Sequence, residues 1–166
     1  MKKLILFSFI ILTLLGCGDE VRFNTPAMQA NREGVTWRAD YFAADIDFGG
    51  FLIEGGSGPE VLQLVTPTDG PGVYSLGNGS SAVAIFRDFD GTVYSTNNIP
   101  DPSVTIYPVE GTINVQEVDT GANPIVISGE FNFTAFSADG LRSVNFIGGV
   151  FNRIPLDGGL EVITTN

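Results

Sequence analysis

Carboxylates are the side chains with which this 166-residue chain could do chemistry, because it contains no histidine and a single cysteine. Without histidine, no Ser-His or Cys-His pair can activate a nucleophile, and no histidine-based zinc or copper site can form. Two suitably spaced acids can hydrolyse a glycosidic bond. The glutamates available for this are Glu54, Glu110, Glu117 and Glu130, and nothing in their spacing selects a pair. We therefore predict no catalytic residue, with a carboxylate-dependent hydrolase as an alternative.

One aspartate motif lies in segment 85–93, where Asp88 and Asp90 stand between an apolar stretch and Gly91-Thr92. The motif resembles the opening of haloacid-dehalogenase-type phosphatases. That resemblance implies Asp88 as the phosphoryl-accepting nucleophile, Asp90 as the general acid/base and Mg²⁺ as the counter-ion. Those enzymes are α/β domains with a later basic residue and a distal acidic pair, whereas the segments after Thr92 have strand patterns. The motif is therefore interpreted as coincidental, with a tight turn at Asp90-Gly91 between two strands.

A second motif, Asp119-Thr120-Gly121, resembles the active-site turn of aspartic proteases, and Ile147-Gly148 resembles a later element of that family. Catalysis in such enzymes needs two aspartates that share a proton, one from each lobe or subunit. The separation between Asp119 and Ile147 is too short for the strands that lie between the two elements in those proteases. The sequence instead predicts a loop between two strands at Asp119.

Pairs of nearby acids also offer the oxygen ligands that calcium prefers, at Asp45 with Asp47 and at Asp88 with Asp90. The spacing of an EF-hand is missing, so solvated turn acids are the favoured interpretation. We predict no metal site and no cofactor.

The single cysteine, Cys17, closes an apolar run that begins after Lys2 and Lys3. A charged start, a short apolar stretch and a small-residue end define an export signal. The stretch 4–15 is shorter than the roughly 20 residues that a membrane-spanning helix needs. The Leu-Leu-Gly-Cys ending resembles a bacterial lipoprotein processing site, which implies cleavage before Cys17 and acylation by palmitate-type chains. We therefore predict a cleaved signal peptide over residues 1–16 and lipidation of Cys17, since several acyl chains anchor a protein firmly.

The residues after the cysteine, Gly18, Asp19 and Glu20, resemble the surface-export signal of Bacteroidota lipoproteins. An acidic, solvated tether is the alternative. We predict that residues 17–26 form the acylated N-terminus and tether, and that the protein is an outer-membrane lipoprotein on either the periplasmic face or the cell surface.

The formal net charge is −11, and it becomes more negative by two when Lys2 and Lys3 leave with the signal. An anionic field of this size repels nucleic acid and acidic lipid headgroups. The predicted partners are the membrane, through the acylated Cys17, and an envelope protein or a glycan. Nucleic acid is excluded.

Alternation of apolar and polar residues predicts β-strands throughout residues 27–166. Val35 to Ala43 reads as one strand with Trp37 on its inner face, and segment 125–134 reads as a long strand that Gly129 interrupts as a bulge. Further strands are predicted over 50–54, 60–66, 72–76, 81–87, 92–95, 112–118 and 142–154. Glycine-containing pairs between them form tight hairpin turns. No long segment has the spacing of an amphipathic helix.

These strands predict an all-β fold: a single antiparallel β-sandwich or flattened β-barrel built from a meander of hairpins. The sequence leaves sandwich and barrel open. Asn97 to Pro108 contains too many prolines for a central strand, so this segment is either a rigid crossover or a loop that carries a site.

Several features carry a resemblance over nearly the whole chain, namely the Cys17 start and the segments 29–37, 72–77, 111–115, 128–133 and 148–151. The chain resembles the uncharacterised single-domain lipoproteins of Bacteroidota that are grouped as a domain of unknown function. This resemblance implies an all-β fold and an envelope location, and it transfers no catalytic residue.

We predict an envelope-anchored lipoprotein that acts as a noncatalytic binding or interaction module and not as an enzyme. A structural or accessory lipoprotein without a ligand is one alternative, and the carboxylate-dependent hydrolase is another. The sequence does not select ligand-binding residues.

Overall fold

A computed structural model describes residues 27–46, 49–104 and 110–164, and all regular elements of this part of the chain are β-strands. The all-β prediction is therefore confirmed, while the predicted signal, Cys17 and the tether lie outside the described residues. The eleven strands are β1 (Met28–Arg32), β2 (Val35–Arg38), β3 (Tyr41–Asp45), β4 (Leu52–Ser57), β5 (Glu60–Val65), β6 (Gly72–Leu76), β7 (Val83–Arg87), β8 (Val93–Ser95), β9 (Gly111–Asp119), β10 (Val126–Ser137) and β11 (Ser143–Pro155). Within the described ranges there is no helix of the length and apolarity that crossing a membrane requires.

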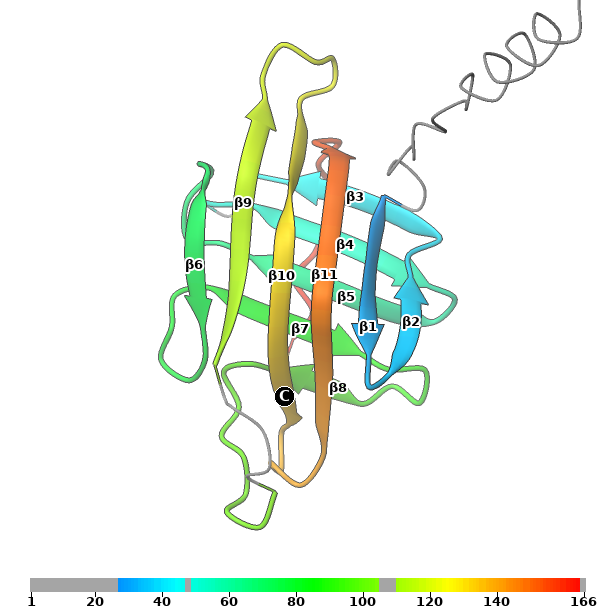
Figure 1. The fold of residues 1–166 in the computed structure, drawn as a ribbon, viewed down its shortest axis with the longest axis vertical. Helices are drawn as coiled ribbons and strands as arrows, with labels where there is room; N and C mark the ends of the chain where they lie inside the picture. Colours follow the sequence, from blue (N-terminus) through cyan, green and yellow to red (C-terminus); the bar gives the residue numbers. More distant parts are fainter. Residues whose placement is uncertain (1–26, 47–48, 105–109, 165–166) are drawn as a thin grey trace, which may run out of the picture.

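The strands form one antiparallel sheet that branches at β10 and curls over on itself. One edge of β10 pairs with β11, whereas the other edge pairs first with β9 and then, at Phe136 and Ser137, with β8. The result is a front layer in the order β2-β1-β11-β10-β9-β6 and a back layer in the order β8-β7-β5-β4-β3. The strands of the back layer run across behind the upright strands of the front layer (Figure 1).

The segment from Val35 to Ala43 differs from the prediction of one strand. It forms two strands, because the chain leaves the front layer at Ala39 and enters the back layer at Asp40, where the amide of Asp40 donates to the carbonyl of Gly56. The change of layer also reverses the face that points inward. Trp37 is buried as expected, but Tyr41 points outward and is exposed.

The core lies between the two layers and is built from aromatic rings. Phe146 of β11 is its centre, with ring centroids 5.1 Å from Phe86 of the back layer and 5.0 Å from Phe133 of the front layer. Trp37 meets the same ring edge-on at 5.9 Å. Aromatic pairs at these separations add to the stability gained from buried area. The core therefore fixes the two layers relative to each other.

Two glycines in the front layer make room for core rings. Gly129 pairs with Phe151 and Gly149 pairs with Phe131 across β10 and β11, so each glycine faces a phenylalanine. A Cβ at Gly129 would lie 2.5 Å from the Phe151 ring, and a Cβ at Gly149 would lie 2.4 Å from the Phe131 ring. The register shifts next to Gly129, which agrees with the expected bulge.

Candidate ligand-binding groove

The first aspartate motif is a hairpin turn between β7 and β8, as the strand pattern predicts. The amide of Asp88 donates to the carbonyl of Thr92 at 2.9 Å, and a carboxylate oxygen of Asp90 accepts the amide of Thr92 at 2.8 Å. Asp88 also lies 3.5 Å from Arg32, and Asp90 lies 3.2 Å from Arg142. Both carboxylates are therefore used to hold this turn and to tie it to the front layer.

The environment of Asp90 favours its charged form. The hydrogen bonds from Thr92, first from its backbone and then from its side chain, lower the pKa of Asp90, and Arg142 adds to that effect. A carboxylate held charged on an exposed turn is typical of a turn acid.

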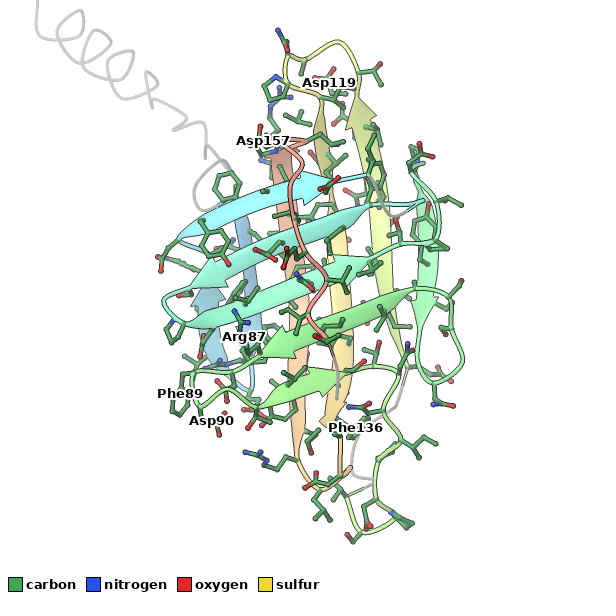
Figure 2. All side chains as sticks on the ribbon, turned by 180° about the vertical axis from the view of Figure 1, so that it is seen from behind. Arg87, Phe89, Asp90, Asp119, Phe136 and Asp157 are labelled. Carbon is green, nitrogen blue, oxygen red and sulfur yellow. The ribbon has the colours of Figure 1, made fainter. Side chains whose placement is uncertain are left out.

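The second motif is also a turn, at the opposite end of the molecule (Figure 2). Asp119 ends β9, accepts the amide of Gly121 at 3.0 Å and pairs with Arg153 at 3.4 Å. Ile147 lies in the middle of β11 and does not pair with this turn. The structure therefore does not bring the two protease-like elements together.

The remaining predicted acids do not gather into a metal site. Within the described residues, no group of three His, Cys, Asp or Glu side chains is placed to hold a metal ion. Asp45 is buried and accepts the amide of Leu160 at 3.0 Å, whereas Asp47 lies outside the described residues. Glu110, Glu117 and Glu130 are all exposed.

Residues 97–104, the described part of the Asn97 to Pro108 connection, pack as a crossover. The Asn98 amide donates to the carbonyl of Phe136 at 2.7 Å, and the amide of Asp101 donates to the carbonyl of Gly140 at 3.0 Å. Residues 105–109 lie outside the described part. A cavity of about 720 Å³ at Glu110 and Thr112 borders this gap, so its remaining wall is not described.

The C-terminal segment covers the outer face of the back layer, and we call residues 157–164 the strap. Figure 2 shows the strap crossing β3, β4, β5 and β7 on the face turned away from the core. Apolar side chains that point outward from these strands include Leu52, Val61 and Ile85, all of them buried. The back layer is thus covered on both faces, by the core on one side and by the strap on the other.

Two polar side chains of the sheet hold the strap. Gln63 of β5 is fully buried, and its amide donates to the carbonyl of Glu161 at 2.7 Å and accepts the amide of Ile163 at 2.8 Å. Asp45 of β3 accepts the amide of Leu160. Buried polar groups require such partners, so these contacts fix where the strap lies.

Glu54, Tyr41 and Gln63 form a fixed polar wall beside the strap. The carboxylate of Glu54 accepts the Tyr41 hydroxyl at 3.1 Å and the Gln63 amide at 2.6 Å. The Tyr41 ring lies over Gly56, where a Cβ would be 2.0 Å from the ring. Burial raises the pKa of Tyr41, Glu54 raises it further, and the charge of Arg87 opposes them.

Arg87 is the charged residue of this surface whose side chain is unpaired. It is exposed at the end of β7, and its side chain makes no ion pair or hydrogen bond with any described residue. Figure 2 shows Arg87 on the face of the back layer that the strap crosses. Its guanidinium is close enough to influence the pKa of Tyr41. Five N–H donors are therefore available to a ligand at this place.

These groups line one groove of about 480 Å³, which we call the strap groove. Its lining residues are Tyr41, Glu54, Val61, Gln63, Arg87, Val93, Gly159, Leu160, Glu161, Val162, Ile163 and Thr164. The volume falls within the roughly 300–1,000 Å³ of small-molecule sites. Half of the lining side chains are polar or charged, so the groove suits a polar ligand.

A family model described as "Domain of unknown function (DUF6252)" matches residues 24–155. The chain belongs to the DUF6252 family. The match contains all eleven strands, and therefore Tyr41, Glu54, Gln63 and Arg87, whereas the strap lies beyond it. No match was found among curated proteins or among solved structures. DUF6252 membership thus gives the family without giving an activity.

Sequence reasoning missed the strap groove as a site. The run Val61 to Val65 contains one polar residue, Gln63, among apolar residues on both faces, and this is a signal of a strand buried on both sides. What covers the outer face was not visible, because the strap has no strand or helix periodicity of its own. Tyr41 was expected on the inner face with Trp37, and the change of layer at Ala39 turns it outward to the groove.

Proposed function

We propose that this DUF6252 protein is a lipid-anchored, noncatalytic binding module of the cell envelope, and that the strap groove is its ligand site. One observation carries the proposal: Tyr41, Glu54 and Gln63 hold one another in place, while the neighbouring Arg87 has no acceptor among the described residues. Binding sites typically contain a few polar groups that are held in place together with a charged group that is free to contact the ligand.

The anchor part of the proposal rests on the sequence. Lys2 and Lys3, the apolar stretch and Cys17 support a cleaved signal over residues 1–16, with residues 17–26 as tether. We expect the wild-type protein to fractionate with outer membranes and to incorporate labelled palmitate, and we expect Cys17→Ser to lose both properties. A Cys17→Ser protein that remains in the membrane and still takes up the label would contradict lipidation at this residue. Protease accessibility on whole cells distinguishes the cell surface from the periplasmic face.

Binding is tested with the full-length protein, purified in detergent and titrated calorimetrically against a panel of envelope oligosaccharides. We expect at least one specific ligand, whose affinity falls in Tyr41→Ala and Arg87→Ala. Arg38→Ala is the matched control, since Arg38 is also exposed and lies on β2 of the front layer. If no ligand binds, or if the affinity of every ligand is unchanged in Tyr41→Ala and Arg87→Ala, a structural or accessory role is favoured.

The same titration tests the absence of catalysis. Mass spectrometry of the recovered oligosaccharide should show the intact ligand after prolonged incubation. Cleaved product that disappears in Glu54→Gln would instead support the carboxylate-dependent hydrolase.

A further inference from the structure

We propose that the strap groove recognises a sugar that carries a carboxylate, with Arg87 binding the carboxylate and Tyr41 contacting the sugar ring. This inference rests on the binding function proposed above, and it specifies the class of ligand.

The register of the back layer places the two residues at opposite ends of one row. Tyr41 pairs with Gly56, Gly56 with Val61, and Val61 with Arg87, across β3, β4, β5 and β7. Neighbouring strands lie about 4.8 Å apart, so the Cα atoms of Tyr41 and Arg87 are separated by roughly 14 Å. The Tyr41 ring fills the space over Gly56, and Val61 forms an apolar floor before Arg87. The groove between them, of about 480 Å³, is large enough for a sugar ring.

The charges near the groove favour a carboxylate over a phosphate. Three of the five described arginines pair with acids of the chain, namely Arg32, Arg142 and Arg153. Arg87 is unpaired and lines a groove, and a guanidinium binds a carboxylate through two parallel hydrogen bonds. Glu54 and Glu161 also line the groove, and they repel a doubly charged phosphate more strongly than a singly charged carboxylate.

The backbone around the groove favours a sugar over a peptide. An extended peptide binds by pairing with a free strand edge, or its terminal carboxylate is captured by free backbone amides. The groove floor is instead the face of paired strands, and the strap amides of Gly158, Leu160 and Ile163 already donate to the sheet. Recognition therefore depends on side chains, and Glu54 and Thr164 are suited to sugar hydroxyls.

The test compares two probes with the same sugar backbone: a tetramer of galacturonic acid, whose carboxylates are charged, and its fully methyl-esterified counterpart, which is neutral. Full-length protein in detergent is titrated with each by calorimetry, as wild type, Arg87→Ala, Arg87→Lys and Arg38→Ala. We expect the free acid to bind about tenfold or more tightly than the ester, because a hydrogen bond to a charged group is lost in the ester. Arg87→Ala should abolish this preference, Arg87→Lys should retain part of it, and Arg38→Ala should retain all of it.

The outcomes separate this inference from the proposed function. If acid and ester bind equally and Tyr41→Ala weakens both, the groove is a binding site but the carboxylate assignment is wrong. If inorganic phosphate or a short peptide with a free C-terminus competes better than the acidic tetramer, the ligand class is wrong. If no oligosaccharide of the panel binds, the inference and the proposed function fall together.

Discussion

The two outer faces of the molecule differ in what covers them. On the front layer, Ile147 points outward and is 60% exposed, whereas on the back layer Ile85 also points outward and is 4% exposed. The front face follows the simple rule of one wet side, with Glu130 and Asn132 alternating with buried Phe131 and Phe133. The back face is covered by the strap. The nearly continuous apolar run from Val61 to Val65 therefore belongs to the layer whose outer face carries the strap groove.

The largest expected effect comes from placing a charge on each face. Ile85→Asp puts a carboxylate beneath the strap, and we expect it to lower the free energy of unfolding by about 4 kcal/mol, because burial penalises the charge. The matched variant Ile147→Asp should change stability by less than about 0.5 kcal/mol. Urea denaturation of both variants checks the comparison. Equal losses would show that the two faces are covered alike.

Removal of the strap is expected to have the next largest effect. A chain that stops after Leu156 loses the half-burial of Leu160 and Ile163 and five hydrogen bonds between strap and sheet, for a destabilisation of about 3 kcal/mol. It should also bind a hydrophobic dye, because Leu52, Val61 and Ile85 become accessible. Val162→Ser, at a strap residue that is already exposed, is the control. Unchanged stability after truncation would mean that the strap does not cover the face in solution.

A smaller effect is expected from Gln63→Leu. Leucine fills the space, but the carbonyl of Glu161 and the amide of Ile163 lose their partner, which should cost about 2 kcal/mol. Gln116→Leu on the exposed side of β9 is the control and should be close to neutral. Hydrogen exchange at Ile163 provides a local readout, and unaltered protection there would contradict the role of Gln63.

The smallest effect concerns pH. The pKa of Tyr41 is raised from its ordinary value of 10.0, so the folded state holds the proton more tightly than the unfolded state. The resulting stabilisation is fully present below pH 10.0 and is lost as pH rises through the raised pKa. Tyr41→Phe should lose less stability over this alkaline range. Ultraviolet titration of Glu54→Gln should show a lower pKa for Tyr41, whereas an unchanged pKa would argue against the Glu54 contact.

The sequence was sufficient for features that depend on local pattern. The alternation around Phe131 and Phe133 predicted β10, and Gly72 to Leu76 was predicted with the observed bounds. The turns at Asp90-Gly91 and after Asp119 followed from turn chemistry.

Features that depend on long-range packing were not predictable. The period of two continues through Ala39, so nothing local marks the change of layer that turns Tyr41 outward. The contacts of Gln63 with Glu161 and Ile163 span about 100 residues of chain and have no local signal. The site was missed because it is made by the strap, and the strap is positioned by side chains of the sheet.

The central claim is that ligand binds in the strap groove and not on the open front face. It is tested most directly by nuclear magnetic resonance on isotopically labelled full-length protein in detergent, titrated with the galacturonate tetramer. We predict shifts at the Arg87 guanidinium, the Gln63 side-chain amide and the strap amides of Leu160 and Ile163, with Thr36 and Asn132 of the front layer unchanged. Shifts confined to the front layer, or none with this tetramer or with any ligand of the oligosaccharide panel, would contradict the account.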